Sequence, residues 1–452
     1  MRTLLFVLLV VSVPFSVAAQ DRLTKVRNDR QNVIDDGYWI YNDLTAAKEQ
    51  AKESGKPILV VIRCIPCEHC AGLDQDVVKP DSATKKLMDQ FVRVRLVQAN
   101  GLDLTQFQYD FDLSFSALVM NADGTIYTRY GNRSSAEDVA DNPIEGFRAT
   151  LAAALDVHKN LDTWRDDLKD KKVQLTKFDR PEKYPTLARY KPTIDFAGTV
   201  VKDCMHCHQI RDAERELARS ETGTIPDEIL FPFPRPEVIG LRLDPGTKAM
   251  VKGVAKDSAA AEAGFQPGDE IVAINNQPIL SLADVQWALE VVDRGLVKVG
   301  PIGFVPAFRD HTYIPVEVNR NGPRKRLTLT MAPGWRKAQD ISWRPTTWEL
   351  RAMALGGLFL KEVSDADRKK LGLADDALAV RVEHAGMYDK HAGAYRAGIR
   401  KDDILIEFDG LKDRRSESQL IARGVQELRP GDKVAIVVLR EGKRLEFAVA
   451  MQ

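Results

Sequence analysis

The sequence predicts a multidomain α/β plus β-rich protein, with an α/β domain followed by two copies of a small β-rich domain. Helical and strand patterns alternate along the amino-terminal third. The carboxyl-terminal half holds an approximate repeat that aligns residues 263–276 with residues 397–410. A chain of 452 residues has room for roughly three domains at about 100 to 200 residues each.

Residues 1–19 are typical of a secretory signal peptide. Arg2 supplies the charged start, residues 4–13 form the apolar run, and we expect cleavage after Ala19. A membrane-spanning helix needs roughly 20 apolar residues, so an uncleaved anchor is the weaker alternative. We therefore expect an extracytoplasmic, periplasmic protein whose mature chain has no membrane span.

The charge balance argues against binding to nucleic acid. Lys and Arg number 65, equal to the 65 Asp and Glu, so there is no excess positive charge for phosphates or acidic lipids. The five cysteines are too few for a disulfide-stapled small protein, but they suit a large exported protein with redox or metal sites.

The first domain is expected over residues 36–158. Asp43 is placed to cap a helix that begins at Leu44, and Gly55 is placed to end it. A βα unit followed by a hairpin fits the rest of the pattern. The expected strands are residues 56–63, 91–97, 117–120 and 125–129.

The first cysteine cluster follows the first of these strands. Cys64, Cys67 and Cys70 form two overlapping CxxC pairs, and the chain after Cys70 has a helical pattern. A helix N-terminus lowers the pKa of a nearby thiol, because its backbone N–H groups and positive dipole end stabilise the thiolate. The spacing therefore predicts reactive thiols.

This region resembles the thioredoxin-like family, in the branch with a helix, Gly55-Lys56-Pro57, an apolar strand and then CxxC. The resemblance implies a dithiol of Cys67 and Cys70, with His69 favouring the thiolate of Cys67. Cys64 is then a third, exchanging thiol.

Two positions depart from the family pattern. The proline that faces the dithiol in the family is replaced by Phe115-Ser116, and the buried acid of many thioredoxins would fall at Val61. Two alternatives therefore stay open for the cluster, a structural disulfide and a zinc site that uses the three cysteines and His69.

Residues 159–235 are charged and interrupted by prolines, so we expect a connector with short helices. Inside it, Cys204-Met-His-Cys-His208 matches CxxCH, the attachment motif of c-type haem. The motif predicts thioether bonds from Cys204 and Cys207 and an axial iron ligand in His208. A disulfide and a zinc site are the alternatives.

The repeat divides the rest of the chain into residues 236–333, a joint at 334–353, and residues 354–452. The joint contains Trp335, Trp343 and Trp348, which we expect to pack between the two copies. Both copies resemble bacterial PDZ domains, over residues 238–243 and 258–271 in the first and 356–360 and 396–404 in the second.

The PDZ resemblance implies peptide recognition. In PDZ domains, backbone N–H groups of a glycine-containing loop bind a peptide carboxylate, and the adjoining strand edge pairs with the peptide backbone. A helix from about Ser281 would form the other wall of the groove, with Leu282, Val285 and Leu289 on one face. The implied loop residues are Ile239, Gly240, Leu241, Gly357, Leu358 and Phe359.

The order of parts resembles a bacterial thioredoxin-like/PDZ (seleno)protein family, some members of which carry selenocysteine at a redox position. We therefore expect an exported thiol-disulfide oxidoreductase or thiol redox sensor. In this hypothesis Cys67 attacks, Cys70 resolves, and the PDZ domains recruit partner proteins or peptides. The alternatives are a non-enzymatic PDZ scaffold with a structural disulfide and an electron-transfer protein with haem at His208. The sequence contains no GxSGG or HExxH motif, which argues against a protease.

Overall fold

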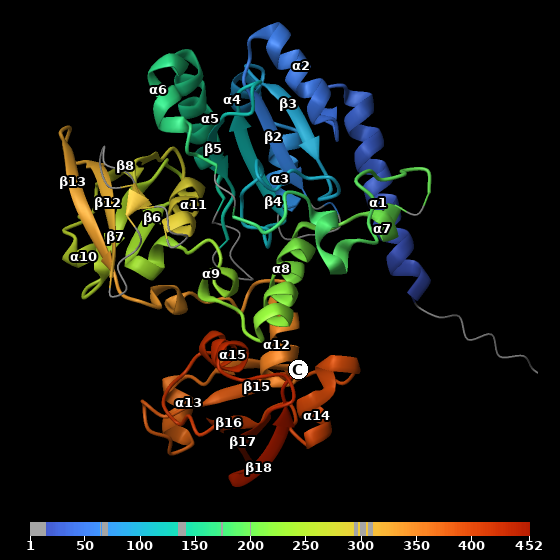
Figure 1. Cartoon of the computed structure of the whole chain (residues 1–452), viewed down its shortest axis with the longest axis vertical. Helices are drawn as coiled ribbons and strands as arrows, with labels where there is room; N and C mark the ends of the chain where they lie inside the picture. The colour runs from blue at the N-terminus through green and yellow to red at the C-terminus, as the bar shows by residue number, and fades with distance from the viewer. Residues whose placement is uncertain are drawn as a thin grey trace, which may run out of the picture.

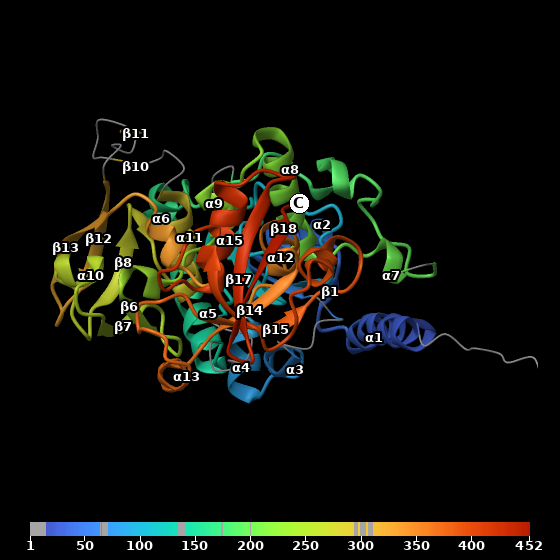
Figure 2. The ribbon, with the colours of Figure 1, turned by 90° about the horizontal axis from the view of Figure 1, so that it is seen from below.

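The computed structural model describes residues 15–63, 65, 71–133, 142–172, 175–198, 200–292, 297–298, 304–305 and 311–452. Figure 1 shows a first domain in blue to teal, a first β-unit in yellow to light orange and a second β-unit in orange to red. We define the first β-unit as residues 236–331 and the second as residues 356–451. Figure 2 views the second β-unit from below, with the first β-unit to one side of it.

The first domain contains a five-stranded sheet with the order β1-β3-β2-β4-β5. The central strand β2 is parallel to β3 and antiparallel to β4. All six of its residues are buried, as expected for an apolar strand that is covered on both faces. The strands are β1 (Ile40–Tyr41), β2 (Ile58–Arg63), β3 (Val92–Leu96), β4 (Phe115–Met120) and β5 (Ile126–Tyr130).

Helices cover both faces of this sheet. Asp43 caps α2 by accepting the N–H of Ala46, and the N–H of Gly55 closes the helix on the carbonyl of Ala51. The predicted helix is therefore present with its predicted ends. The helices are α2 (Leu44–Ser54), α3 (Ala71–Val78), α4 (Ser82–Met88), α5 (Ile144–Lys159) and α6 (Leu161–Leu168).

The segment expected to be a connector is a structural layer of the first domain. Met205 and Ile210 lie in the same hydrophobic core as Val60 and Val94 of the sheet. Sequence patterning missed this contact because charged residues interrupt the apolar positions, which become contiguous only on folding. Its elements are η1 (Pro181–Lys183), η2 (Pro185–Leu187), α7 (Val200–Asp203), α8 (Cys207–Thr222) and α9 (Asp227–Leu230).

The first β-unit contains a sheet with the order β13-β12-β8-β7-β6, in which β9 also pairs with β8. The edge strand β6 and helix α11 are the walls of the expected groove. The elements are η3 (Pro236–Ile239), β6 (Leu241–Asp244), β7 (Met250–Val254), α10 (Ala259–Glu262), β8 (Glu270–Ile274), β9 (Gln277–Pro278), α11 (Leu282–Val292), β10 (Val297–Lys298), β11 (Phe304–Val305), β12 (Thr312–Asn319) and β13 (Arg324–Met331).

The second β-unit repeats this arrangement with the sheet order β14-β15-β16-β17-β18. The joint before it forms η5 (Trp335–Ala338) and α12 (Thr347–Leu355). Helix α12 crosses the domain boundary expected at residue 353. The unit contains β14 (Leu358–Glu362), α13 (Asp365–Lys370), β15 (Val380–Ala385), η6 (Asp389–Ala392), α14 (Gly393–Ala397), β16 (Ile404–Phe408), α15 (Glu417–Gln426), β17 (Lys433–Arg440) and β18 (Lys443–Ala450).

The two β-units share a buried ion pair in addition to their strand order. Asp269 pairs with Arg320 at 2.6 Å in the first unit, and Asp403 pairs with Arg440 at 2.7 Å in the second. Each aspartate directly precedes the strand that follows the repeated glycine motif, and each arginine directly precedes a hairpin turn. The sequence repeat is therefore a structural repeat.

The helix α1 (Phe15–Asp36) continues through the expected cleavage point, whereas residues 1–14 of the expected signal lie outside the described residues. Among the helices described, none has both the length and the apolar character needed to cross a membrane.

Candidate functional site

One edge of the first sheet gathers the ends of four strands. Arg63 at the end of β2 pairs with Phe115 at the start of β4, and Ile62 pairs with Leu96 at the end of β3. Tyr130 at the end of β5 pairs with Ala117 of β4. We call this the cysteine edge, because Cys64 follows Arg63 directly in the chain.

The predicted dithiol belongs to the segment that connects β2 with α3. Strand β2 ends at Arg63, and α3 begins at Ala71, directly after Cys70. This strand-to-helix connection matches the context expected for a reactive CxxC. Cys64, Cys67, His69 and Cys70 themselves lie outside the described residues.

The charges beside this segment are balanced. Asp74, in the first turn of α3, lies 3.4 Å from Arg63 and 2.7 Å from the buried Arg95. Arg95 also pairs with Asp29 at 2.9 Å. Burial opposes the charge on Arg95, but Asp74 and Asp29 outweigh it and raise its pKa above the usual range. The carboxylate of Asp74 is therefore paired with two arginines.

The position of the missing family proline is a regular strand start. Phe115 is buried at the first position of β4, and the Ser116 hydroxyl donates to the Tyr130 carbonyl at 3.3 Å. None of the described peptide bonds is cis. The guanidinium of Arg63 donates to the Ser114 carbonyl at 3.1 Å, which ties the end of β2 to the start of β4.

The second cysteine cluster lies at the same edge of the sheet. The N–H of Ala99, three residues after β3, donates to the Met205 carbonyl at 2.9 Å. The side chain of Asn100 accepts the N–H of Met205 at 2.7 Å and donates to the Asp203 carbonyl at 2.9 Å. Cys204 stands between Asp203 and Met205 in the chain, so these bonds hold Cys204 near the cysteine edge. Sequence reasoning identified both clusters, but it did not place the second one beside the end of β3.

The second cluster has both cysteines, Cys204 and Cys207, buried and His208 near the surface. Cys207 is buried, and the Tyr109 hydroxyl lies 3.0 Å from its sulfur. The His208 side chain is 35% exposed, with its Nδ1 3.6 Å from Asp212. Burial raises the pKa of Asp212, and His208 opposes this rise.

This arrangement is a poor fit to covalent haem. In a CxxCH site, both sulfurs and the histidine meet the same porphyrin. Here Cys207 contributes to the domain core with Tyr109 and Ile210, whereas His208 reaches the surface. The haem and its axial ligand His208 stay predictions, and we derive no step through them. Over the described residues, no group of three or more His, Cys, Asp or Glu side chains is arranged to hold a metal ion.

A buried charge cluster joins the first domain to the joint. Arg344 donates to Asp110 at 2.7 Å and to Asp112 at 2.8 Å, and Thr346 donates to Asp112 at 2.9 Å. Arg215 of α8 donates to Thr346 at 2.5 Å. Burial raises the pKa of Asp110, whereas for Asp112 the arginines outweigh burial and lower the pKa. Sequence analysis missed this cluster, because nothing local pairs residues so far apart.

The groove helix α11 of the first β-unit packs against the first domain. The expected loop residues connect two elements: η3 ends at Ile239, and the edge strand β6 begins at Leu241. Between them, the N–H of Gly240 donates to the Glu237 carbonyl at 3.0 Å. On α11, the buried Asp284 accepts from Lys171 at 2.9 Å and from Thr128 at 2.7 Å. Burial lowers the pKa of Lys171 to about 8, against the attraction of Asp284. The helix wall of this groove is therefore anchored to the first domain, at strand β5 and at Lys171.

The groove of the second β-unit holds a segment of the same chain. The N–H of Gly357, which we expected to bind a peptide carboxylate, donates to the Arg351 carbonyl at 2.8 Å and closes α12. Leu358 is buried, and the Arg351 guanidinium lies 4.4 Å from the centre of the Phe359 ring. In this conformation, the Gly357 amide is already used.

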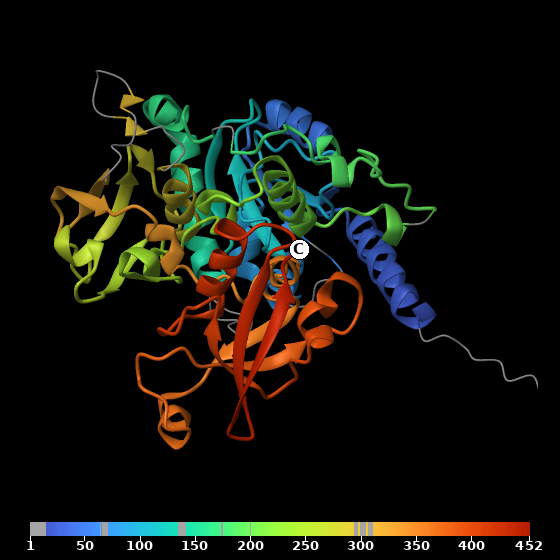
Figure 3. The same cartoon turned by 60° about the horizontal axis from the view of Figure 1, so that its bottom comes forward.

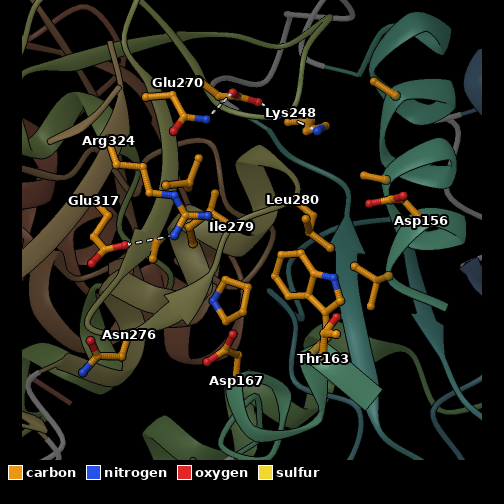
Figure 4. A pocket seen from close by; sticks show the side chains of 18 of the residues that line it. Asp156, Thr163, Asp167, Lys248, Glu270, Asn276, Ile279, Leu280, Glu317 and Arg324 are labelled. Carbon is orange, nitrogen blue, oxygen red and sulfur yellow. Dashed lines mark hydrogen bonds and ion pairs between the residues drawn. The ribbon is translucent and has the colours of Figure 1, made fainter. Parts of the chain in front are cut away.

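A cavity of about 810 Å³ lies between α5, α6 and the first β-unit (Figure 4). Alanines of α5 and Trp164 form one wall. Two of the charged side chains on the other wall pair with neighbours, Lys248 with Glu270 at 3.8 Å and Arg324 with Glu317 at 3.5 Å. Its described lining contains no cysteine and none of the expected groove residues, so it is separate from the predicted sites.

Comparison with known proteins identifies two domains. A family model described as thioredoxin-like matches residues 39–122, and a PDZ domain model matches residues 250–299. The first match covers the first sheet through β4, and the second lies within the first β-unit.

Curated relatives and solved structures share part of the chain. A probable periplasmic serine endoprotease DegP-like of Pseudomonas fluorescens is 26% identical over 46% of this chain. A protein of the same description from Pseudomonas savastanoi pv. phaseolicola is 25% identical over 44% of it. The chain spans 38% and 37% of the length of these two relatives.

The structure of the HtrA-type protease AlgW with a tripeptide is 17% identical, with a TM-score of 0.20, and the match covers 31% of this chain and 53% of that one. The AlgW structure with a decapeptide gives 16% identity and the same TM-score, over 34% and 51% of the two chains. The family models are the more specific finding, and they show that this chain contains a thioredoxin-like domain followed by a PDZ domain.

Proposed function

We propose that this protein is an extracytoplasmic thiol-disulfide oxidoreductase or thiol redox sensor. The observation that carries the proposal is the place of the CxxC segment in the chain, between strand β2 and helix α3 of a domain that a thioredoxin-like family model matches. Strand β2 ends at the cysteine edge, and the bonds of Ala99 and Asn100 hold Met205 of the second cluster close to the end of the neighbouring strand β3. The curated relatives are named periplasmic, and disulfides persist outside the cytoplasm.

The proposed chemistry uses Cys67 and Cys70. The Cys67 thiolate attacks one sulfur of a partner disulfide, a mixed disulfide forms, and the other partner sulfur leaves as a thiolate. The Cys70 thiolate then attacks the Cys67 sulfur and releases the second partner thiolate. Two electrons pass to the partner, and a Cys67–Cys70 disulfide remains. His69 favours the Cys67 thiolate, and Cys64 exchanges with the pair.

The PDZ domain indicates which class of partner the protein would bind. Its groove would bring peptides or protein termini to the thioredoxin-like domain, through the loop of Ile239, Gly240 and Leu241. We assign the second β-unit as a further PDZ-like domain, on the basis of its matching strand order and its Asp403–Arg440 pair.

The Cys67→Ser variant tests the proposal. We expect it to abolish disulfide exchange with a model protein disulfide, because no thiolate starts the reaction. The Cys207→Ser variant is the control, since Cys207 is buried in the domain core, and we expect it to keep exchange. If Cys67→Ser exchanges at the wild-type rate, the enzymatic proposal is wrong and the scaffold alternative is favoured.

A further inference from the structure

The groove of the second β-unit is filled by α12 of the same chain. Figure 1 places α12 beside α15, and Figure 3 shows the second unit from another side, below the first domain. The two helices cross at Ala354 and Gly424. A Cβ atom on Gly424 would lie 2.5 Å from the Ala354 Cβ, so only glycine allows this approach without a shift. Helix α12 therefore packs directly against the groove helix α15, and it also contacts the groove strand β14.

Glu417, the first residue of α15, holds α12 and the groove strand together. Its carboxylate accepts from Arg351 at 2.9 and 2.6 Å and from the N–H of Leu360 at 2.7 Å. In a PDZ groove, N–H groups of this strand pair with a bound peptide. Here α12 supplies the Arg351 guanidinium to Glu417 and the Arg351 carbonyl to the N–H of Gly357. A bound ligand would make polar contacts with the same two groups of the groove.

The other end of α12 reaches the cysteine edge. Three residues before the helix, Arg344 binds Asp110 and Asp112, which lie in the loop that leads into β4. Ser114 of the same loop accepts from Arg63, the residue before Cys64. The contacts thus form a continuous connection from the second groove to Arg63, the residue before Cys64 in the chain.

We propose that the groove between β14 and α15 is an effector site, with α12 as its resident ligand. The external ligand that fits is a peptide with a free C-terminal carboxylate and a basic side chain near its end. The carboxylate would replace the Arg351 carbonyl at Gly357, and the basic side chain would replace the Arg351 guanidinium at Glu417. Departure of α12 withdraws Arg344 from Asp110 and Asp112, and this loosens the loop at the cysteine edge.

The exchange of ligands is a competition. The tethered α12 acts at a high effective concentration, so an external peptide shifts the population only when it binds the vacated groove more tightly than α12 does. A change in thiol reactivity as a result of the loosened loop rests on the proposed function. The conformational coupling does not, because it is measured without thiol chemistry.

Hydrogen–deuterium exchange of the full chain tests the proposal. The probe is a synthetic decapeptide that ends in Arg-Ala-Leu with a free carboxylate, and the same peptide with an amidated end is the control. At saturation we expect exchange to rise about 10-fold or more in residues 347–355 and in residues 105–114. We expect the amidated peptide to leave both segments unchanged. Unchanged exchange in 347–355 would overturn the site, and a change confined to 347–355 would overturn the coupling.

A pair of variants tests the same connection without a peptide. Arg351→Ala removes the contacts with Glu417, and we expect faster exchange in residues 347–355 and 105–114. Arg440→Ala breaks an ion pair of the same unit away from α12, so its effect should stay within the second β-unit. Equal effects of the two variants on residues 105–114 would contradict the proposal. If Arg351→Ala does not fold, the hydrogen–deuterium exchange of the unaltered chain with the peptide tests the connection.

Discussion

The two β-units have the same strand order and the same buried ion pair, but their grooves have different neighbours. The groove helix α11 of the first unit is anchored to the first domain through Asp284, Lys171 and Thr128. The corresponding helix α15 contacts α12 through Glu417 and Gly424. The repeated residues therefore determine the fold of each unit, and a few residues on the groove helix determine what the unit contacts.

One helix position illustrates the difference. Asp284 and Gln419 occupy equivalent places, because the N–H of each binds the serine that begins its helix, Ser281 or Ser416. Asp284 is fully buried against Lys171, whereas Gln419 is exposed. A similar backbone thus carries an inter-domain contact in one unit and a solvent-facing residue in the other.

The largest effect is expected at the joint between the units. Arg344→Met removes the cation and leaves Asp110 and Asp112 buried without it, which should lower the free energy of unfolding by about 3–5 kcal/mol. Urea unfolding followed by tryptophan fluorescence measures this loss. Adding Asp112→Asn should recover part of it. A loss under about 1 kcal/mol would mean that the contact of Arg344 with Asp110 and Asp112 does not stabilise the packing of the joint on the first domain.

A matched pair of substitutions tests the difference between the groove helices. Asp284→Ala leaves Lys171 buried without its carboxylate, so we expect a loss of about 3 kcal/mol or more. Gln419→Ala removes only an exposed capping contact, so we expect about 1 kcal/mol or less. Thermal unfolding of the two variants gives both values. Equal losses would show that the two helices have equivalent roles.

The shared ion pair tests what the units have in common. Arg320→Ala leaves the fully buried Asp269 unpaired and should cost about 2–3 kcal/mol. Arg440→Ala should cost less, because the Arg440 side chain is 35% exposed, compared with 13% for Arg320. Chemical denaturation gives the ranking, and a larger loss for Arg440→Ala would contradict the argument from exposure.

The smallest effect, counted per pH unit, is a pH dependence at the contact between Lys171 and Asp284 of the first unit. Burial lowers the pKa of Lys171 to about 8, below the value of about 10.4 in an unfolded chain. Between these values the unfolded chain binds more protons, so Lys171 makes stability rise with pH from about 8 to about 10.4. The rise is at most about 1.4 kcal/mol per pH unit. Lys171→Met should lack it, and parallel stability profiles of the two proteins would exclude this titration.

Several parts of the fold were predictable because their signals are local. The apolar run of β2, the cap at Asp43 and the glycine end at Gly55 predicted their elements within a few residues. The repeat predicted two units of matching strand order. The tryptophans of the joint were predicted less well, since Trp343 is buried as expected but Trp348 is 42% exposed.

The sequence alone determined the positions of the cysteines, the strand-to-helix context of the first cluster and the repeated β-unit, since each depends on residues close together in the chain. Only the tertiary structure placed Met205 beside Ala99 and paired Arg344 with Asp112, which is 232 residues away. It also placed α12 in the second groove. The physical reason is that a buried charge or a close helix crossing depends on where distant segments return, and no local pattern encodes that return.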